Sequence, residues 1–396
     1  MQMDILLEQA TALLPELKAL KEDLHRHPEL SWRERRTTAL LRERLAALGL
    51  ELIDLGMETG CAALLRGGRP GPTVALRADI DAIVQETPEE GEVVSEAPGV
   101  MHACGHDFHT AGLYGAARLL SAMRDGLAGN VAFLFQPAEE TTGGARAMLA
   151  HGLWEKLPAK PACVFGLHNR PQLPTGTVAV QEGPLMSEKA NFTVVLHGRT
   201  GHGGTPQKCV DVIVPAAAIV QAVQSIVSRN TAPEDPLVCA VCSIHAGTPE
   251  NFAPDLLTMT GSIRAFSHET RMMAQTRLEA IVRDISAAYG CTSDFDCREA
   301  APLLSNSPAM TALARRAAAS VLGEDHIVGA APEMSSEDFP EFGREVPYFF
   351  YWLGSGFPDR ENAGWHSPKF RTDDSALPIA AALLARSALE GLAWTP

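Results

Sequence analysis

Residues 101–109 read Met-His-Ala-Cys-Gly-His-Asp-Phe-His, so three histidines, a cysteine and an aspartate fall within one short segment. Imidazole and thiolate together suit zinc and similar metals far better than calcium or magnesium. Cys104 and His106 are two positions apart, and in an extended segment both side chains point to the same side. The segment therefore predicts a metal site with two ligands from one loop. The alternative is a histidine-rich surface loop with a buried thiol.

Other residues of ligand type follow candidate buried strands: Asp79 after 74–77, Glu139 and Glu140 after 131–135, and His168 after 163–167. In open α/β sheets, sites lie outside the carboxyl ends of the strands, so these side chains are expected to meet there. A further histidine, His366, stands just before a turn near the end of the chain.

The donors of this set number five: Cys104, His106, Glu140, His168 and His366. One tetrahedral zinc takes four ligands, so the set suits two metals that share a bridging ligand and a water, which is a known hydrolytic arrangement. Of the two adjacent glutamates, one can bind metal while the other moves the proton of the water to a leaving amine. The alternative for this pair is two solvated acids that open a helix.

Composition narrows the class of protein. The 396 residues are 46% hydrophobic and 20% charged, as in globular proteins, and the net charge of −15 argues against nucleic acid and anionic membranes as partners. No apolar run approaches the length of a membrane span, and the first 24 residues lack the features of a signal peptide. A cytoplasmic protein with cysteines kept as thiols is therefore expected. Cys239 and Cys242 should point to opposite sides of a buried strand, which favours packing over chelation.

The elements that must position these residues form an α/β pattern with a mostly parallel central sheet. Its strands are those named above and 347–353, and its helices are expected at 3–24, 33–48, 107–124, 143–152, 307–322 and 373–391. Between them, the strands at 190–197, 237–245, 255–264 and 292–297 and the helices at 211–229 and 268–289 follow the ferredoxin-like β-α-β-β-α-β order. The prediction is a catalytic domain of residues 1–185 and 301–396, with an inserted domain of residues 186–300.

The motifs resemble a known family, the di-metal amidohydrolases and exopeptidases of the hippurate hydrolase, aminoacylase and indole-acetyl-amino-acid hydrolase type. Seven motifs occur in the family's order and span nearly the whole chain: Arg-Ala-Asp-Ile-Asp-Ala (77–82), His-Ala-Cys-Gly-His-Asp (102–107), Gln-Pro-Ala-Glu-Glu (136–140), Gly-Leu-His (166–168), Gly-His (201–202), Met-Ser-Ser-Glu-Asp-Phe (334–339) and His-Ser-Pro (366–368).

The resemblance implies that the five donors named above bind the metals and that Glu139 is the general base. Cys104 would stand where relatives outside this branch use a bridging aspartate. Arg77 stands where those relatives use a metal-binding histidine, so it is not counted as a ligand. Asp79 would then orient a ligand, with a strand-end cap as its alternative. With five donors in place, His102 and His109 are interpreted as support or packing. Whether Glu337 and Asp338 line the pocket stays open.

In the inserted domain, His202 resembles a residue that stabilises the oxyanion, and Asn251 and Arg264 resemble residues that grip the substrate carboxylate. The alternatives are a loop histidine, a turn residue and a strand-edge charge. In relatives this lid domain also dimerises, so a homodimer or higher homo-oligomer is expected. The residues next to His202 and Asn251 depart from the family pattern, as does Met-Ser-Ser at 334–336, and these departures put the identity of the substrate in doubt.

The predicted function is a metal-dependent amidohydrolase that cleaves the amide bond of small N-acyl amino acids. It would use two divalent metal ions, with zinc expected and manganese or cobalt left open. A dipeptidase or aminopeptidase is the nearest alternative, and a non-catalytic metal-dependent binding protein is an alternative of another class. A structural zinc site fits poorly, because such sites take four ligands from nearby residues and these donors span residues 104–366.

Overall fold

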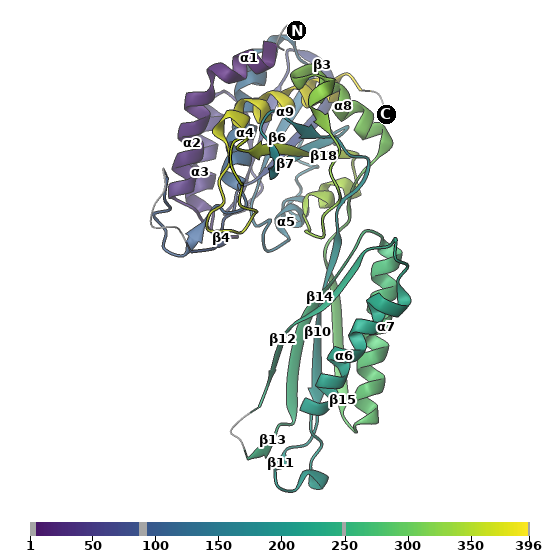
Figure 1. Cartoon of the computed structure of the whole chain (residues 1–396). Coiled ribbons are helices and arrows are strands. Elements are labelled where there is room, and N and C mark those ends of the chain that lie inside the picture. The colour runs from purple at the N-terminus through teal and green to yellow at the C-terminus, as the bar shows by residue number, and fades with distance from the viewer. Residues whose placement is uncertain (1–4, 87–92, 248–250, 395–396) are drawn as a thin grey trace. The chain divides into compact units, whose positions relative to one another are not determined.

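The computed structural model describes residues 5–86, 93–247 and 251–394, and its contacts divide the chain into two units (Figure 1). The first comprises Met1–Gly183, Ser305–Ala331 and Asp338–Pro396, and the second Pro184–Leu304 and Pro332–Glu337. The segment predicted as an insertion lies within the second unit. Residues 332–337 join it unexpectedly, because Ser187 donates hydrogen bonds to the backbone oxygens of Met334 and Ser335.

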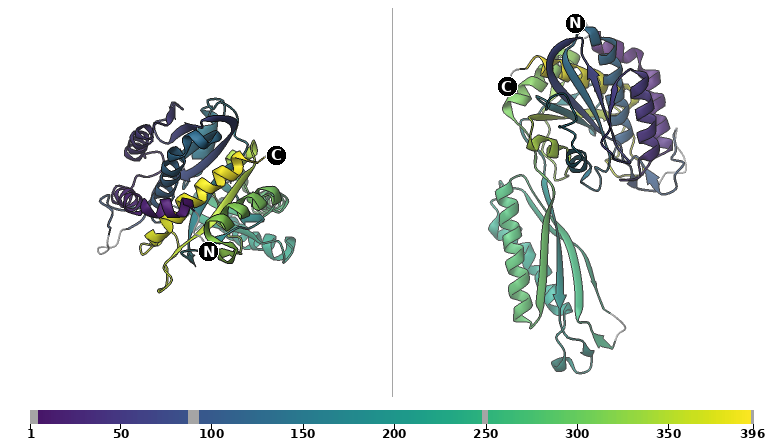
Figure 2. Two further views of the ribbon diagram at one scale, coloured as in Figure 1. Left: turned by 90° about the horizontal axis from the view of Figure 1, so that it is seen from above. Right: turned by 180° about the vertical axis from the view of Figure 1, so that it is seen from behind.

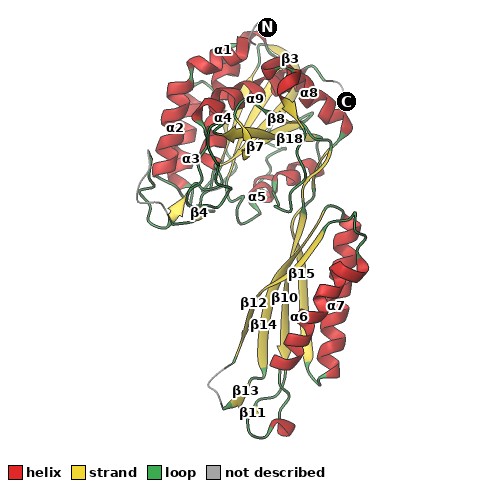
Figure 3. Ribbon diagram, in the orientation of Figure 1, coloured by secondary structure: helices red, strands yellow, loops and turns green. Residues whose placement is uncertain are grey.

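Among the described residues, the first unit contains an eight-stranded sheet of order β1-β2-β6-β3-β7-β18-β8-β17 (Figure 3). Its strands are β1 Glu51–Ile53, β2 Cys61–Arg66, β3 Arg69–Asp79, β6 Ala128–Gln136, β7 Val164–Pro174, β8 Val178–Ala179, β17 Ile327–Val328 and β18 Tyr348–Gly356. The four central strands run parallel, which confirms the predicted α/β fold with a mostly parallel sheet. The sequence analysis misses β1 and β2, which add antiparallel at one edge.

The helices of the first unit are α1 Ile5–Ala12, α2 Leu14–Arg26, α3 Arg35–Ala47, α4 His106–Ala122, α5 Gly144–Ala150, α8 Pro308–Leu322 and α9 Leu377–Leu392. The prediction of one helix over 3–24 is wrong, because the chain breaks between α1 and α2. Pro15 lies in the first turn of α2, where its missing N–H is tolerated, and it could not continue a preceding helix without loss of a hydrogen bond.

The core of the first unit lies on both faces of the sheet. Alternate residues of β3, such as Val74 and Leu76, pack with the apolar sides of α4 and α9. The opposite face is covered by α5 and the 3-10 helix Phe339–Arg344, whose Phe339 ring meets Phe350 of β18. Side chains that follow the strands are therefore held by a framework packed on two sides.

The C-terminal helix is more apolar than the sequence analysis anticipates. Asp374–Leu392 has a mean hydropathy of 1.3 and is long enough to cross a membrane, so the statement that no run approaches this length is wrong. However, 72% of this segment is buried inside the protein, and α9 packs on α4 and the sheet. This burial is typical of a core helix.

The second unit has a four-stranded antiparallel sheet of order β12-β14-β10-β15 among its described residues. Its main elements are β10 Glu188–His197, α6 Ile213–Asn230, β12 Leu237–Ala246, β14 Leu256–Ala265, α7 His268–Ala288 and β15 Thr292–Ala301, in the predicted β-α-β-β-α-β order. Both helices cover one face of the sheet (Figure 2), and burial alternates along β10 and β14 accordingly. Cys239 is buried and Cys242 exposed, as expected for opposite sides of β12. The prediction of a buried strand is wrong, because β12 lies at the edge of this sheet and most of its residues are exposed or half-buried.

Candidate metal centre

Cys104 ends a loop, and His106 is the first residue of α4. The chain turns sharply between them at Gly105, which has a φ of 94°, so the prediction of one extended loop that carries both ligands is wrong. A Cβ atom at this position would lie 2.2 Å from the Nδ2 atom of Asn169. That amide donates a hydrogen bond of 2.6 Å to the backbone oxygen of Cys104. Glycine is therefore required here both by the left-handed backbone and by the close approach of Asn169.

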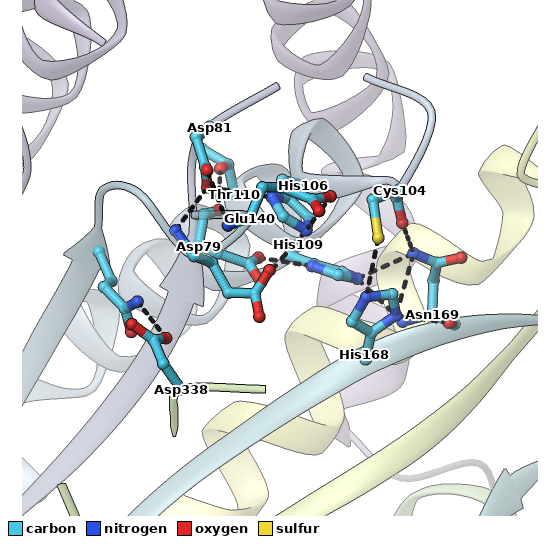
Figure 4. A network of polar contacts seen from close by, with 12 residues as sticks. Asp79, Asp81, Cys104, His106, His109, Thr110, Glu140, His168, Asn169 and Asp338 are labelled. Atoms are coloured by element: carbon cyan, nitrogen blue, oxygen red, sulfur yellow. Dashed lines mark hydrogen bonds and ion pairs between the residues drawn. The ribbon is translucent and has the colours of Figure 1, made fainter. Parts of the chain in front are cut away.

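The predicted donors meet at the side of the sheet where the central strands end, and Figure 4 shows Cys104, His106, Glu140 and His168 there. The expectation that His168 follows its strand is wrong, because β7 continues through it to Pro174 and His168 pairs with Trp352 of β18. The Sγ atom of Cys104 lies 3.3 Å from Nε2 of His168. The Oε1 atom of Glu140 lies 3.8 Å from Nε2 of His106 and 3.3 Å from Nε2 of His366. The structure thus brings together all five side chains that the sequence analysis selects as ligands.

The five donors divide into two sets of three that share one atom. Cys104 groups with His106 and His168, and it groups equally with Glu140 and His366, with the ligand atoms of each set within 4.8 Å of one another. His366 reaches the second set through a left-handed backbone (φ 60°), while its N–H donates to the oxygen of Ala103. The Cys104 thiol is therefore placed where it could bind a metal ion in either of the two sets.

The polar contacts around these donors leave specific atoms available. Nδ1 of His168 contacts the backbone oxygen of Asn169 at 2.8 Å, and Nδ1 of His106 contacts Oδ1 of Asp81 at 3.3 Å. The opposite ring nitrogens, Nε2, face the other donors. Nε2 of His106 and Oε1 of Glu140 are buried without a hydrogen bond in the described structure. Metal-binding histidines usually donate their second N–H in this way, so the donor set fits divalent cations.

His109 and Asp79 support this set. His109 contacts Oδ1 of Asp79 through Nδ1 at 2.6 Å, and its Nε2 accepts the N–H of Asn169 at 2.9 Å. Both ring nitrogens are thereby engaged, although His109 also lies within ligand distance of Asp79 and His106. The interpretation of His109 as support agrees with this geometry. His102 is buried, and among the described residues it joins no such group.

The site carries an excess of negative charge. Burial raises the pKa of the Cys104 thiol well above its usual range, and the charges of Glu140 and Glu139 raise it further. Burial lowers the pKa of His106, but the charges of Asp79 and Asp81 outweigh that effect and raise it to about 10. A cation held among these side chains would act against both pKa shifts, because it would favour the thiolate of Cys104 and replace the proton on His106.

Arg77 is not a metal ligand. It lies at the centre of a buried network of ion pairs and hydrogen bonds. Its fully buried guanidinium donates to Oε1 of Gln136 at 2.8 Å and to Oδ2 of Asp79 at 3.0 Å, and it lies 3.5 Å from Oδ1 of Asp338. Asp338 also accepts the N–H groups of Gly143 and Ala145 at the start of α5. The network therefore ties together both ends of the loop that carries the two glutamates. Asp338 therefore supports this loop.

The remaining predicted residues lie in the second unit. His202 lies on β11 Gly201–His202, which pairs with β13 Phe252–Ala253, and the N–H of Gly203 donates to the oxygen of Asn251. His202 is exposed, and its Nδ1 accepts the N–H of Gly204. Arg264 lies on β14 and donates to the oxygen of Met334 at 2.8 Å. Their roles toward a substrate remain predictions.

A scan against known families matches residues 75–390 to peptidase family M20/M25/M40. The chain belongs to this family. The match covers both units, including every residue selected above. M20 proteins of known structure share the fold, since a dinuclear metal-binding M20 peptidase of Bacillus subtilis superimposes with a TM-score of 0.84 at 34% identity, covering 97% of this chain and 99% of that one.

Two curated relatives of this M20 chain have named activities. An N-acetylcysteine deacetylase of Bacillus subtilis (strain 168) is 38% identical over 371 residues, which cover 93% of this chain and 95% of the relative. A thermostable carboxypeptidase of Saccharolobus solfataricus is 36% identical over 370 residues, covering 91% and 92% respectively. The resemblance to metal-dependent amidohydrolases and exopeptidases is thereby confirmed.

Sequence reasoning missed the importance of Asp81 in this M20 site. Besides His106, its carboxylate accepts the N–H groups of Glu139 at 3.1 Å and Glu140 at 3.0 Å, and the hydroxyl of Ser31 at 2.7 Å. The signal was present in the sequence, because Asp79 is the last residue of β3 and Asp81 follows it with a spacing of two. Two acids at a buried strand end are too many for a simple cap, so each needs partners.

Proposed function

We propose that this protein is a metal-dependent amidohydrolase that cleaves N-acyl amino acids to a carboxylic acid and a free amino acid. The observation that carries the proposal is the pair of donor sets that share Cys104, with the Glu139 carboxylate beside them. The named activities of the deacetylase and carboxypeptidase relatives support the same reaction class, hydrolysis of an amide next to a free carboxylate.

The residues that would hold two divalent ions are the five predicted donors, with Cys104 shared. When bound, such ions lower the pKa of a water toward about 7 and polarise the scissile carbonyl. The similarity to a dinuclear metal-binding M20 peptidase supports two ions, and thiolate with imidazole favours zinc over manganese or cobalt. Within the described structure, the buried Nε2 of His106 has no hydrogen bond, which supports the fit.

Glu139 is proposed as the general base. Its carboxylate takes the proton of the attacking water and passes it to the leaving amine nitrogen. Asp81 binds the backbone N–H groups of both glutamates, so it holds the loop in one orientation. Asp79 accepts a hydrogen bond from Arg77 and contacts His109, and its Oδ2 atom also lies 3.5 Å from Nε2 of His106, so it is proposed to orient that ligand. Catalysis then depends on a preorganised acid–base group rather than on a mobile side chain.

The second unit is proposed to act as a lid that recognises the substrate. His202 would stabilise the oxyanion, and Asn251 with Arg264 would bind the substrate carboxylate, for which a guanidinium fork is suited. Burial lowers the pKa of Arg264, but a guanidinium stays protonated at neutral pH and so keeps the charge that this role requires. A homodimer or higher homo-oligomer in the cytoplasm completes the proposal, and both remain predictions from the resemblance and the composition.

The test is a panel of N-acetyl, N-benzoyl and N-indoleacetyl amino acids together with dipeptides, assayed with and without a chelator. Glu139→Gln should abolish turnover while elemental analysis still finds two metals per chain. A Glu139→Gln protein with full activity would refute the mechanism. Cleavage of dipeptides in preference to every N-acyl amino acid would favour the peptidase alternative, and metal binding with no hydrolysis of any compound would favour a binding protein.

A further inference from the structure

Glu34 is a buried acid whose side chain lies beneath the loop of the two glutamates. It immediately precedes α3 in the sequence, yet its Oε1 atom accepts the N–H of Ala138 at 2.8 Å, across 104 positions. Its side chain is fully buried, and its second oxygen, Oε2, has no hydrogen bond in the described structure. A fully buried carboxyl group that binds a backbone N–H 104 positions away calls for an explanation.

The backbone of the loop at Ala138 is strained. Ala138 adopts a φ of 52°, the left-handed region that residues other than glycine rarely occupy. Such a conformation persists only when surrounding contacts impose it. The contact from Glu34 supplies one of these constraints at the residue immediately before Glu139.

Three consecutive N–H groups of this loop are bound by two buried carboxylates. Ala138 donates to Glu34, while Glu139 and Glu140 donate to the two oxygens of Asp81. Successive N–H groups in such a turn form a concave site for anions. In this protein the side chains of Glu34 and Asp81 occupy that anion site. Backbone contacts therefore set the directions of the side chains at 139 and 140.

We propose that Glu34 is a positioning residue that holds Ala138 in its left-handed conformation and thereby aims the Glu139 carboxylate. The inference rests on the proposed function for its catalytic consequence. Glu34 does not touch the donors of the metal centre in any contact that the described residues make, so it acts through the backbone. Its Oε1 atom is needed as a hydrogen-bond acceptor, and its charge is not.

Three variants separate these requirements. Glu34→Met keeps a side chain of similar volume but removes the acceptor, and Glu34→Gln keeps an acceptor without the ability to ionise. Glu29→Ala is a matched control, because Glu29 also accepts two backbone N–H groups, those of Arg36 and Thr37, but does so at the start of α3. Should methionine prevent folding, Glu34→Ala repeats the test with a smaller side chain.

The first readout is hydrogen exchange of the peptide that spans residues 136–142, which requires no substrate. Glu34→Met should exchange faster than the wild type in this peptide, whereas Glu34→Gln should exchange no faster and the Glu29→Ala control should match the wild type. The second readout is kinetic. Glu34→Met should lower kcat by about 100-fold with KM within about threefold, because misplacing a catalytic group by about 1 Å costs roughly that much. Both variants should retain their metals.

The result that would overturn the proposal is wild-type exchange and wild-type kcat in the folded Glu34→Met or Glu34→Ala protein. A Glu34→Gln protein as impaired as Glu34→Met would also overturn it, because the amide retains the acceptor. If the wild type hydrolyses no compound of the panel, the proposed function fails, but hydrogen exchange still decides whether Glu34 holds the loop. The two failures are therefore distinguishable.

Discussion

The protonation of Glu34 should make the stability of the first unit depend on pH. Burial, together with the charge of Asp81, raises the pKa of Glu34 from its ordinary value of 4.5 to about 7 in the folded protein. Between these two values the folded state binds a proton that the unfolded state has lost. The stability that Glu34 contributes is thus fully present below 4.5 and is lost as the pH rises toward about 7.

The magnitude follows from the two pKa values. Each pH unit between them lowers the free energy of unfolding by about 1.4 kcal/mol, which amounts to about 3 kcal/mol over the whole window. Glu34→Gln cannot ionise and should lack this decrease. The variant should therefore match the wild type near pH 4.5 and become more stable than it by about 3 kcal/mol near pH 8.

The assay is denaturant unfolding of metal-free protein in a chelator, followed by tryptophan fluorescence at several pH values. All five tryptophans lie in the first unit, at positions 32, 154, 352, 365 and 394, so the signal reports that unit alone. Taking the difference between variant and wild type removes the titration of all other groups. Stability curves that run parallel across this pH range would refute the reasoning, because they would mean that Glu34 has the same pKa in both states.

Three further predictions concern the metal centre and its support. Arg77→Met should lower the free energy of unfolding of the first unit by about 3–5 kcal/mol, since Asp79 and Asp338 would be left as buried carboxylates without their cation; unchanged stability in the fluorescence assay would contradict this. Cys104→Ser should reduce the metal content by elemental analysis below that of Glu139→Gln, because the thiol belongs to both donor sets. Removal of metal should abolish hydrolysis and lower the midpoint temperature of unfolding. Zinc added back at about 1,000 times its Kd should raise the free energy of unfolding by about 4 kcal/mol. A midpoint temperature that does not change with zinc would argue against a preformed metal site.

Most of the fold could be predicted because its elements have strong patterns. Continuous apolar runs mark the central strands β6 and β7, and long amphipathic periods mark α6 and α7. Of the two strands that were missed, β1 is the weaker locally. β1 has three residues, two of them exposed, and it exists because β2 offers an edge to pair with. Such pairing is a property of the sheet and has no period of its own in the sequence.

The site was predictable in its membership but not in its arrangement. Ligand-type residues near the ends of parallel strands lie at one edge of the sheet, so Glu140 and His168 could be assigned to one centre from their positions. Cys104 and His106 could be added because of their ligand chemistry. Their division into two sets that share the thiol depends on side-chain directions. These are set by contacts such as Asn169 to Cys104 and Asp81 to His106, which join residues 65 and 25 positions apart.

Residue types and their spacing were enough to predict the α/β class, the candidate donors and the reaction class that these donors suit, because both limit local structure and metal chemistry. How the donors are supported depends on contacts that form only in the folded chain. The buried cation of Arg77 and the carboxylates of Asp81 and Glu34 act on a loop that lies far from them in the chain. A buried charge must find its partner in three dimensions, and no local pattern records which backbone N–H groups that partner will be.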